Sequence, residues 1–307
     1  MRILLAGTPY FAKVVFEDLL KDTQHTILGL LTQPDKPFGR KQELKLPETK
    51  SFLLSKIPNL PILQPERISA QTLDSVRGLH PEIIVVVAYG QILSKEFLDI
   101  APCVNLHASI LPHLRGASPL QEMIMANPRF FGVSLMQMKE SLDSGAILGI
   151  SFVKNINQNI EELANILAIK GAQILQQFLQ DFEREKQILP LPQCNADSSY
   201  CKKIKKSDGE ICFDNAEAIY RKYLAFKGWP SIFAKNGLKI LEIISFDTQG
   251  HFTPAQILRI LPKSVIVGCE CGSLEISKVQ APSKNPMDIT TYFLGVRLKV
   301  GDKLVDS

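Results

Sequence analysis

Residues 104–119 read VNLHASILPHLRGASP, and this stretch organises the rest of the chain. It follows closely on the run EIIVVVAYG at 82–90, whose uninterrupted aliphatic residues predict a buried strand. Asn105 and His107 stand at positions i and i+2 of an extended segment, so their side chains point to the same side of it. An amide donor and a titratable imidazole that face one small volume are typical equipment for acyl-group chemistry. We therefore expect a catalytic site at this point.

On the N-terminal side of this stretch, aliphatic strands alternate with helical segments. A short apolar strand at 2–6 precedes helical periodicity at 10–21, and further strands are expected at 26–31, 60–63 and 83–88. This alternation predicts an α/β fold with a mainly parallel sheet that is covered on both faces. The turn at 7–9 lacks Gly-x-Gly-x-x-Gly, so a dinucleotide fingerprint is absent. Ligands of such sheets bind at the carboxyl ends of the strands, where 104–119 begins its turn.

The second half of the chain changes character after a long helix. We expect a helix at 120–126, a strand at 132–138, a turn LDSG at 142–145 that leads into another strand, and a helix at 160–185 opened by a capping box at Asn159 and Glu162. Two prolines and polar residues at 187–199 mark a linker. A helix at 215–224 and short strands separated by glycines predict a small antiparallel barrel or sandwich. The expected divisions are a domain at 1–186, a linker at 187–202 and a domain at 203–307.

Composition limits the class of protein. The chain has 307 residues, of which 45% are hydrophobic and 21% charged, which is ample for two globular domains. No apolar run reaches the roughly 18 residues that span a bilayer, and the start MRILLAG lacks a signal-peptide cleavage pattern. We expect a cytoplasmic protein. Its six scattered cysteines are then free thiols, and no metal site is indicated.

Positive charge is concentrated in three places. Residues 200–307 carry 16 Lys/Arg against 11 Asp/Glu (+5), whereas residues 1–199 carry 19 against 20 (−1). The stretch at 33–50 reads QPDKPFGRKQELKLPETK, which suits either a mobile basic loop that grips a substrate or a solvated connection. The run KKIKK at 202–206 suits either a solvated face or a track for a phosphate backbone. A polyanion is the partner that this distribution suggests.

An arbitrary Asn-x-His is more often a capped turn with a structural histidine. Here the position at the sheet edge, the Pro- and Gly-rich turn that follows, and Asp143 in the LDSG turn favour catalysis. A carboxylate near His107 would fix its tautomer and steady its charged form. Ser109 is a rival nucleophile, but it lacks a Gly-x-Ser-x-Gly elbow, and His113 reads as a loop histidine.

Several motifs carry a resemblance to a known family. They are AGTPYFA at 6–12, TQPDKP at 32–37 with Gly39-Arg40, VVAYG at 86–90, VNLHASILP at 104–112, RGASP at 115–119, GVSLMQM at 132–138, LDSG at 142–145, and Trp229-Pro230. With these motifs the chain resembles the folate-dependent formyltransferases essentially from end to end. Asn-x-His with the later Asp is common to that family. The RGASP and QPD segments are similar to those of the subgroup that acts on charged initiator tRNA.

The resemblance implies a Rossmann-like formyltransferase domain followed by a smaller OB-type β-barrel that helps to hold tRNA. It implies transfer of a formyl group from 10-formyltetrahydrofolate to the α-amine of methionine on initiator methionyl-tRNA, without a metal. The product, N-formylmethionyl-tRNA, serves translation initiation. We expect a monomer with no membrane partner.

The resemblance also assigns site residues. Asn105, His107 and Asp143 are the implied catalytic trio. The implied folate site consists of Val87, Ala88, Tyr89, Gly90, Ser109, Ile110, Leu111 and Pro112. Arg40 is the loop residue that wedges against the acceptor stem, and basicity adds Lys41, Lys203 and Lys206 to the expected tRNA contacts.

Two other functions stay open. Formyl transfer to a small amine, such as a glycinamide nucleotide or an amino sugar, uses the same trio but needs neither the basic loop nor the basic second domain. A non-catalytic folate- or RNA-binding module would not need an intact trio. The chain departs from the family pattern at Phe131, at 139–141 and in the basic loop, and none of these departures touches the trio. The proton that reaches the leaving folate nitrogen comes either from His107 or through water.

Overall fold

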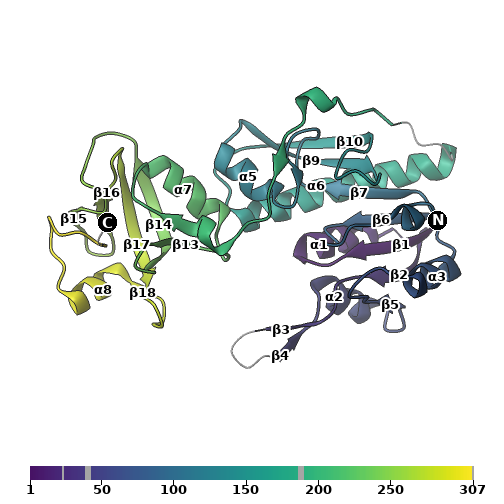
Figure 1. The fold of residues 1–307 in the computed structure, drawn as a ribbon, viewed down its shortest axis with the longest axis horizontal. Helices are drawn as coiled ribbons and strands as arrows, with labels where there is room; N and C mark the ends of the chain where they lie inside the picture. The colour runs from purple at the N-terminus through teal and green to yellow at the C-terminus, as the bar shows by residue number, and fades with distance from the viewer. Residues whose placement is uncertain (23, 39–42, 186–189, 306–307) are drawn as a thin grey trace. The chain divides into compact units, whose positions relative to one another are not determined.

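A computed structural model describes residues 1–22, 24–38, 43–185 and 190–305, which form two compact units (Figure 1). The first unit comprises Met1–Pro119, Arg129–Lys154 and Leu163–Cys201, and the second comprises Leu120–Pro128, Asn155–Glu162 and Lys202–Ser307. Within the described ranges, no helix combines the length and the apolar character needed to cross a membrane.

A seven-stranded sheet forms the centre of the first unit. The strands lie in the order β10-β9-β7-β6-β1-β2-β5. The five strands from β7 to β5 pair in parallel, while β9 pairs antiparallel with both β7 and β10. The expectation of a mainly parallel sheet is thus confirmed. The bounds are β1 Arg2–Gly7, β2 Thr26–Leu31, β5 Ile62–Leu63, β6 Ile83–Val87, β7 Cys103–His107, β9 Phe130–Gln137 and β10 Ile147–Lys154.

Helices cover both faces of this sheet, which explains why its central strands are aliphatic throughout. On one face, alternate residues such as Leu4 and Ile84 pack against α3 (Ala70–Leu79) and α4 (Lys95–Leu98). On the other face lie α1 (Tyr10–Leu19) and α6 (Ile160–Glu185), where Gly171 allows α6 to approach Leu106 of β7. All residues of β6 are buried, because neither of its faces meets water.

The long helix α6 begins and ends where its sequence predicts. The Asn159 side chain accepts hydrogen bonds from the backbone of Glu161 (3.0 Å) and Glu162 (3.2 Å), and Glu162 accepts one from the Asn159 backbone (3.0 Å). This arrangement confirms the capping box. The apolar stripe of α6, including Leu163 and Leu175, is buried.

The stretch 33–50 is more ordered than we expected from its polar sequence. It contains a hairpin of β3 (Lys36–Phe38) and β4 (Glu43–Lys45), and α2 (Glu48–Lys56) begins at its end. The prediction of an irregular loop is therefore wrong for these residues, because three-residue strands are too short to produce a recognisable alternation. Residues 39–42 lie outside the described part of the chain.

The second unit combines α7 (Ala216–Ala225) with a mostly antiparallel sheet. The strands follow the order β12-β13-β14-β17-β16-β15, β18 pairs with β17, and only β12 and β13 are parallel among the described pairs. The predicted antiparallel second domain is confirmed, whereas α8 (Ile289–Val296) was not predicted. The strand bounds are β12 Glu210–Ile211, β13 Ile232–Ala234, β14 Lys239–Asp247, β15 Ile257–Ile260, β16 Val265–Gly268, β17 Ser273–Gln280 and β18 Met287–Asp288.

The predicted linker is only partly described, since 187–189 lie outside the described ranges. From Leu191 to Cys201 this segment is hydrogen-bonded to the first unit and contains β11 (Tyr200–Cys201), which runs parallel to β8 (Arg115–Gly116). The expected domain limits at 186 and 203 stay predictions.

Candidate active site

Asn105 and His107 lie at the carboxyl end of β7, on the same face of the sheet. Their side chains are almost buried, with 9% and 6% of the residue surface exposed. The intervening Leu106 points to the opposite face, toward Gly171 of α6. The two side chains therefore share one side of the strand, as their i, i+2 spacing predicts, because side chains alternate along a strand.

Asp143 reaches His107 from the turn between β9 and β10. Its Oδ2 atom lies 3.6 Å from His107 Nδ1 and accepts a hydrogen bond from the backbone N–H of Gly116 at 2.8 Å. The predicted proximity of the two turns is thus present in the structure. Asp143 adopts a φ of +46°, a left-handed conformation that is uncommon for a residue with a side chain.

The second ring nitrogen of His107 contacts the backbone. Nε2 lies 2.8 Å from the carbonyl oxygen of Leu114. Because a carbonyl can only accept, Nε2 carries a proton and donates it, which leaves Nδ1 as the nitrogen that gains or loses a proton. We expected a carboxylate to fix the tautomer, but the structure gives that contact to the Leu114 carbonyl. Asp143 Oδ2 instead faces Nδ1, the nitrogen that carries no proton in this tautomer.

The amide of Asn105 makes no hydrogen bond within the described part of the chain, although the residue is nearly buried. Its polar atoms are not among the fully buried atoms without a partner, so they keep some exposed surface through which a ligand can be reached. Asn105 is thus available to donate to a ligand oxygen beside His107.

The two predicted folate segments follow neighbouring strands of the sheet. In the segment after β6, Val87 and Tyr89 are buried while Ala88 and Gly90 are exposed. Tyr89 is 2% exposed, and its hydroxyl has no hydrogen-bond partner among the described residues; burial raises its pKa to about 12. A ligand at this edge would therefore meet backbone together with Ala88 and Gly90.

In the segment after β7, Ser109 and Leu111 are buried, and Ile110 and Pro112 are half-buried. The Ser109 hydroxyl donates to the carbonyl of His113 at 2.6 Å. A serine whose proton is held by a carbonyl in the protein interior is poorly placed as a nucleophile, as its sequence context also indicates.

Thr8 and Gln33 are residues that sequence reasoning did not single out. Thr8 Oγ1 (3.0 Å) and Gln33 Nε2 (3.3 Å) both donate to the carbonyl of Tyr89. They follow β1 and β2, and β1 and β6 flank the point where the strand order reverses, where ligands of open α/β sheets bind. Both residues belong to motifs on which the family resemblance rests. That membership is the sequence signal that could have identified them.

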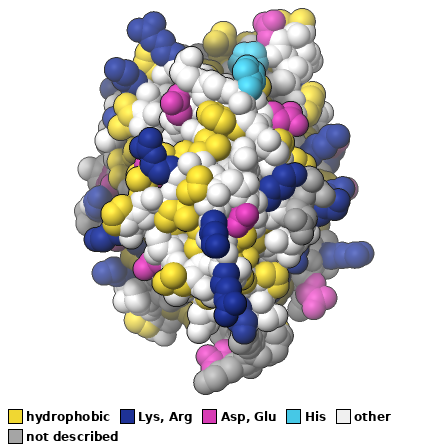
Figure 2. Space-filling view, turned by 90° about the vertical axis from the view of Figure 1, so that its left-hand side faces the viewer, with side chains coloured by type: hydrophobic (Ala, Val, Ile, Leu, Met, Phe, Trp, Pro, Cys, Tyr) yellow, Lys and Arg dark blue, Asp and Glu magenta, His cyan; other side chains and the backbone are white. Residues whose placement is uncertain are grey.

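The predicted tRNA contacts are only partly described. Arg40 and Lys41 lie outside the described residues. Lys203 and Lys206 are exposed in the second unit. Figure 2 shows Lys and Arg side chains distributed over one face, with hydrophobic side chains between them.

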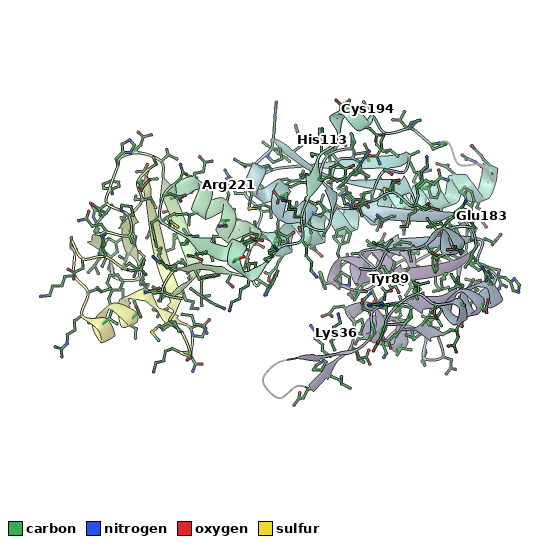
Figure 3. All side chains as sticks on the ribbon, in the orientation of Figure 1. Lys36, Tyr89, His113, Glu183, Cys194 and Arg221 are labelled. Carbon is green, nitrogen blue, oxygen red and sulfur yellow. The ribbon has the colours of Figure 1, made fainter. Side chains whose placement is uncertain are left out.

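The charge of Lys50 is paired within the first unit and does not add to the exposed positive charge of the stretch 33–50. Its Nζ atom binds Asp35 Oδ2 at 2.8 Å and Gln64 Oε1 at 2.6 Å. Gln64 and Lys50 hold the pKa of Asp35 below its usual value by hydrogen bonding to the carboxylate. Lys36, in contrast, is exposed at the start of β3 (Figure 3).

All six cysteines are free. Within the described ranges, no group of three or more His, Cys, Asp or Glu side chains could hold a metal ion.

Sequence comparison matches both parts of the chain to formyl transferases. The formyl transferase family matches residues 1–179, and the formyl transferase C-terminal domain matches residues 203–297. A methionyl-tRNA formyltransferase of Helicobacter acinonychis is 46% identical over 99% of this chain and 100% of that protein. The corresponding protein of Wolinella succinogenes is 44% identical over 99% of each chain.

Structural comparison finds the same fold in solved proteins. HypX from Aquifex aeolicus in complex with tetrahydrofolic acid superposes with a TM-score of 0.68 at 15% identity, over all of this chain and 50% of that one. A methionyl-tRNA formyltransferase from Clostridium thermocellum gives a TM-score of 0.55 at 18% identity, over 81% of this chain and 94% of that one.

Proposed function

This chain belongs to the methionyl-tRNA formyltransferase family, and we propose that Asn105, His107 and Asp143 are its catalytic trio. The enzyme transfers a formyl group from 10-formyltetrahydrofolate to the α-amine of methionine on initiator methionyl-tRNA. Relatives that share 44–46% of its residues over nearly the whole chain support this activity. The observation that carries the assignment of the trio is the contact of 3.6 Å between His107 Nδ1 and Asp143 Oδ2, on the same side of β7 as the Asn105 amide, which has no partner among the residues described.

His107 is the proton acceptor of the reaction. The amine must be neutral to attack the formyl carbon, and Nδ1 is the ring nitrogen that can take its proton, because Nε2 already donates to Leu114. Asp143 Oδ2 steadies the imidazolium that results.

Asn105 stabilises the charge that develops on the formyl oxygen. As the new C–N bond forms, the carbonyl π electrons move to oxygen, and the Asn105 amide is available as a hydrogen-bond donor at the same edge of β7. When the oxyanion collapses, the bond to the folate nitrogen breaks and that nitrogen takes a proton. The proton comes from His107 or through water.

The remaining assignments follow the two units. Residues 87–90 and 109–112 line the folate site, mainly through backbone and the less buried members of each segment. The second unit binds tRNA through Lys203 and Lys206, and Arg40 and Lys41 contact the acceptor stem. We place the division between a formyltransferase domain at 1–186, a linker at 187–202 and a tRNA-binding domain at 203–307. The enzyme acts as a monomer in the cytoplasm, where charged initiator tRNA is used.

The test is a formylation assay with purified protein, 10-formyltetrahydrofolate and methionyl-tRNA, with unacylated tRNA and an amino sugar nucleotide as alternative acceptors. We expect N-formylmethionine to appear on methionyl-tRNA alone. Formylation of the sugar amine without formylation of methionyl-tRNA would contradict the proposed acceptor. Loss of activity in Asp143→Asn, with folding retained, supports the trio, whereas wild-type turnover would contradict its assignment.

A further inference from the structure

The segment Leu191–Cys201, which we call the strap, is fastened to the active site along its length. Leu191 exchanges backbone hydrogen bonds with Ile147 at the start of β10 (2.8 and 2.9 Å). At its other end, β11 pairs in parallel with β8, so that Cys201 lies beside Gly116. A Cβ atom on Gly116 would come within 2.3 Å of the Cys201 carbonyl oxygen, so this close pairing requires glycine. The two ends of the strap are thus held next to β10, which follows the Asp143 turn, and next to Gly116, which donates to Asp143.

Gln193 links the strap to the turn that carries Asp143. Its Nε2 atom donates to the carbonyl oxygen of Asp143 at 2.9 Å and to that of Gly145 at 2.6 Å. A single amide thus ties together the two ends of the Asp143–Gly145 turn. Gln193 is itself only partly exposed, so these bonds are shielded from competing water.

Arg115 sets the orientation of the Gln193 amide. Its Nε (3.0 Å) and Nη2 (2.7 Å) atoms both donate to Gln193 Oε1. Because the guanidinium has no acceptor, the oxygen of Gln193 must face Arg115 and the NH₂ group must face the two carbonyls. Arg115 is 2% exposed, which makes this orientation rigid.

The conformation of the turn explains why it needs such a support. Asp143 has a φ of +46°, where a side chain is strained, and strained residues persist only when their surroundings determine them. The backbone of Gly145 passes close to Gln137, since a Cβ atom there would lie 1.6 Å from the Gln137 carbonyl oxygen. The bonds from Gln193 oppose the release of this strain, and a released turn would carry the Asp143 carboxylate away from His107.

We propose that Gln193 is a positioning residue for catalysis, which acts by holding the Asp143 turn in its strained conformation. The proposal rests on the proposed catalytic role of Asp143. It makes Gln193 the residue of the strap that supports the active site.

A pair of isosteric substitutions isolates this role. Gln193→Glu keeps the acceptor for Arg115 but replaces the NH₂ donor by a carboxylate oxygen that repels the carbonyls of Asp143 and Gly145. Asn195→Asp is the matched control, because Asn195 Oδ1 also accepts from Arg115 (3.1 Å) but Asn195 makes no described contact with the turn. Both variants change one amide to one carboxylate beside the same guanidinium.

We expect Gln193→Glu to lower kcat about 10- to 100-fold, the cost of a displacement of about 1 Å in a catalytic group. KM for both substrates should change less than about threefold, because neither substrate contacts Gln193 in this scheme. Asn195→Asp should keep kcat within about twofold of wild type. Thermal unfolding of each variant is measured alongside, and Gln193→Met, which is neutral and similar in volume, replaces Gln193→Glu if the latter does not fold.

A double-variant cycle separates positioning from a general structural effect. Gln193→Glu should lower kcat less than about twofold further in an Asp143→Asn background, because it acts through Asp143. An equal loss in both backgrounds would overturn the proposal, as would a kcat for Gln193→Glu no lower than for Asn195→Asp. If Asp143→Asn alone keeps wild-type kcat, the catalytic assignment of Asp143 is wrong, and this proposal is overturned with it.

Discussion

At the scale of single residues, the two ring nitrogens of His107 face two different kinds of oxygen. Leu114 offers a neutral carbonyl to Nε2, and Asp143 offers a charged oxygen to Nδ1. The first contact selects the tautomer, and the second stabilises the protonated ring. The Asp143 carboxylate is therefore not needed to select the tautomer. Its role in the proposed mechanism is to stabilise the ring after Nδ1 has accepted a proton.

Asn105→Ala should lower turnover about 100- to 1,000-fold, which is the usual cost of removing one donor to a developing oxyanion. Affinity for the folate donor should change little, because the interaction strengthens only in the transition state. Steady-state kinetics and folate binding by fluorescence measure the two effects. Asn59→Ala, at an exposed position, is the control, and near-normal turnover of Asn105→Ala would argue against the oxyanion role.

The cysteines should differ in reactivity according to their burial. Burial raises the pKa of the Cys103 and Cys269 thiols to about 12, so almost no thiolate forms at pH 8. Cys194, Cys212 and Cys271 are exposed. Brief treatment of the native protein with iodoacetamide at pH 8, followed by mass spectrometry, should label these three. Labelling of Cys103 at the same rate would contradict the burial of its thiol.

At the scale of elements, the site depends on backbones that approach closely at glycine. The turn between β9 and β10 passes Gln137 at Gly145, and β8 passes β11 at Gly116. The segments that carry Asp143 and its partners can approach this closely only because glycine has no side chain.

Gly145→Ala should destabilise the protein by about 2 kcal/mol or more, because the new methyl group collides with a backbone carbonyl that cannot move freely. Gly78→Ala in α3 is the matched control, since nothing lies within 4 Å of its Cβ position. That control should leave stability unchanged or raise it by up to about 1 kcal/mol. Denaturation in urea compares the two, and equal stability of both variants would show that the turn has room.

Asp35→Asn should remove a pH-dependent contribution to stability. Hydrogen bonds from Gln64 and Lys50 lower the pKa of Asp35 in the folded protein below its ordinary 3.8, so the folded state favours the charged form. The stabilisation is complete above the unfolded pKa and is lost as the pH falls through the folded value. Wild type should be more stable than Asp35→Asn at pH 7, and the difference should shrink below pH 3.8. Urea unfolding at several pH values measures it, and a difference independent of pH would contradict the role of the carboxylate.

At the scale of the whole molecule, the proposed catalytic residues and the basic C-terminal stretch belong to different units. Asn105, His107 and Asp143 belong to the first unit, while the stretch 202–307, which belongs to the second, carries an excess of five positive charges. A large polyanionic acceptor fits this division, because phosphate contacts supply affinity without taking part in the reaction.

Lys203→Ala with Lys206→Ala should weaken tRNA binding at low salt and reduce the slope of log affinity against log salt by about 1–2, since each phosphate contact contributes about 0.7–0.9. Lys21→Ala with Lys56→Ala removes the same charge from exposed positions of the first unit and is the control. Filter binding over a range of salt concentrations measures both. A slope unchanged by the first pair, or changed equally by both pairs, would count against this contact.

By itself the sequence determined the strand that carries Asn105 and His107, the capped helix α6 and the mainly parallel sheet, because these depend on periodicity and on local hydrogen bonding. It also identified Asp143 as a partner, through the turn that contains it. Only the tertiary structure decided how that partner is held. The Leu114 carbonyl, the left-handed φ of Asp143 and the link through Gln193 and Arg115 depend on segments that are distant in sequence, and no local pattern encodes such contacts. The same holds for the predicted linker, whose irregular sequence signals a connection, although its residues from Leu191 to Cys201 are hydrogen-bonded to the first unit.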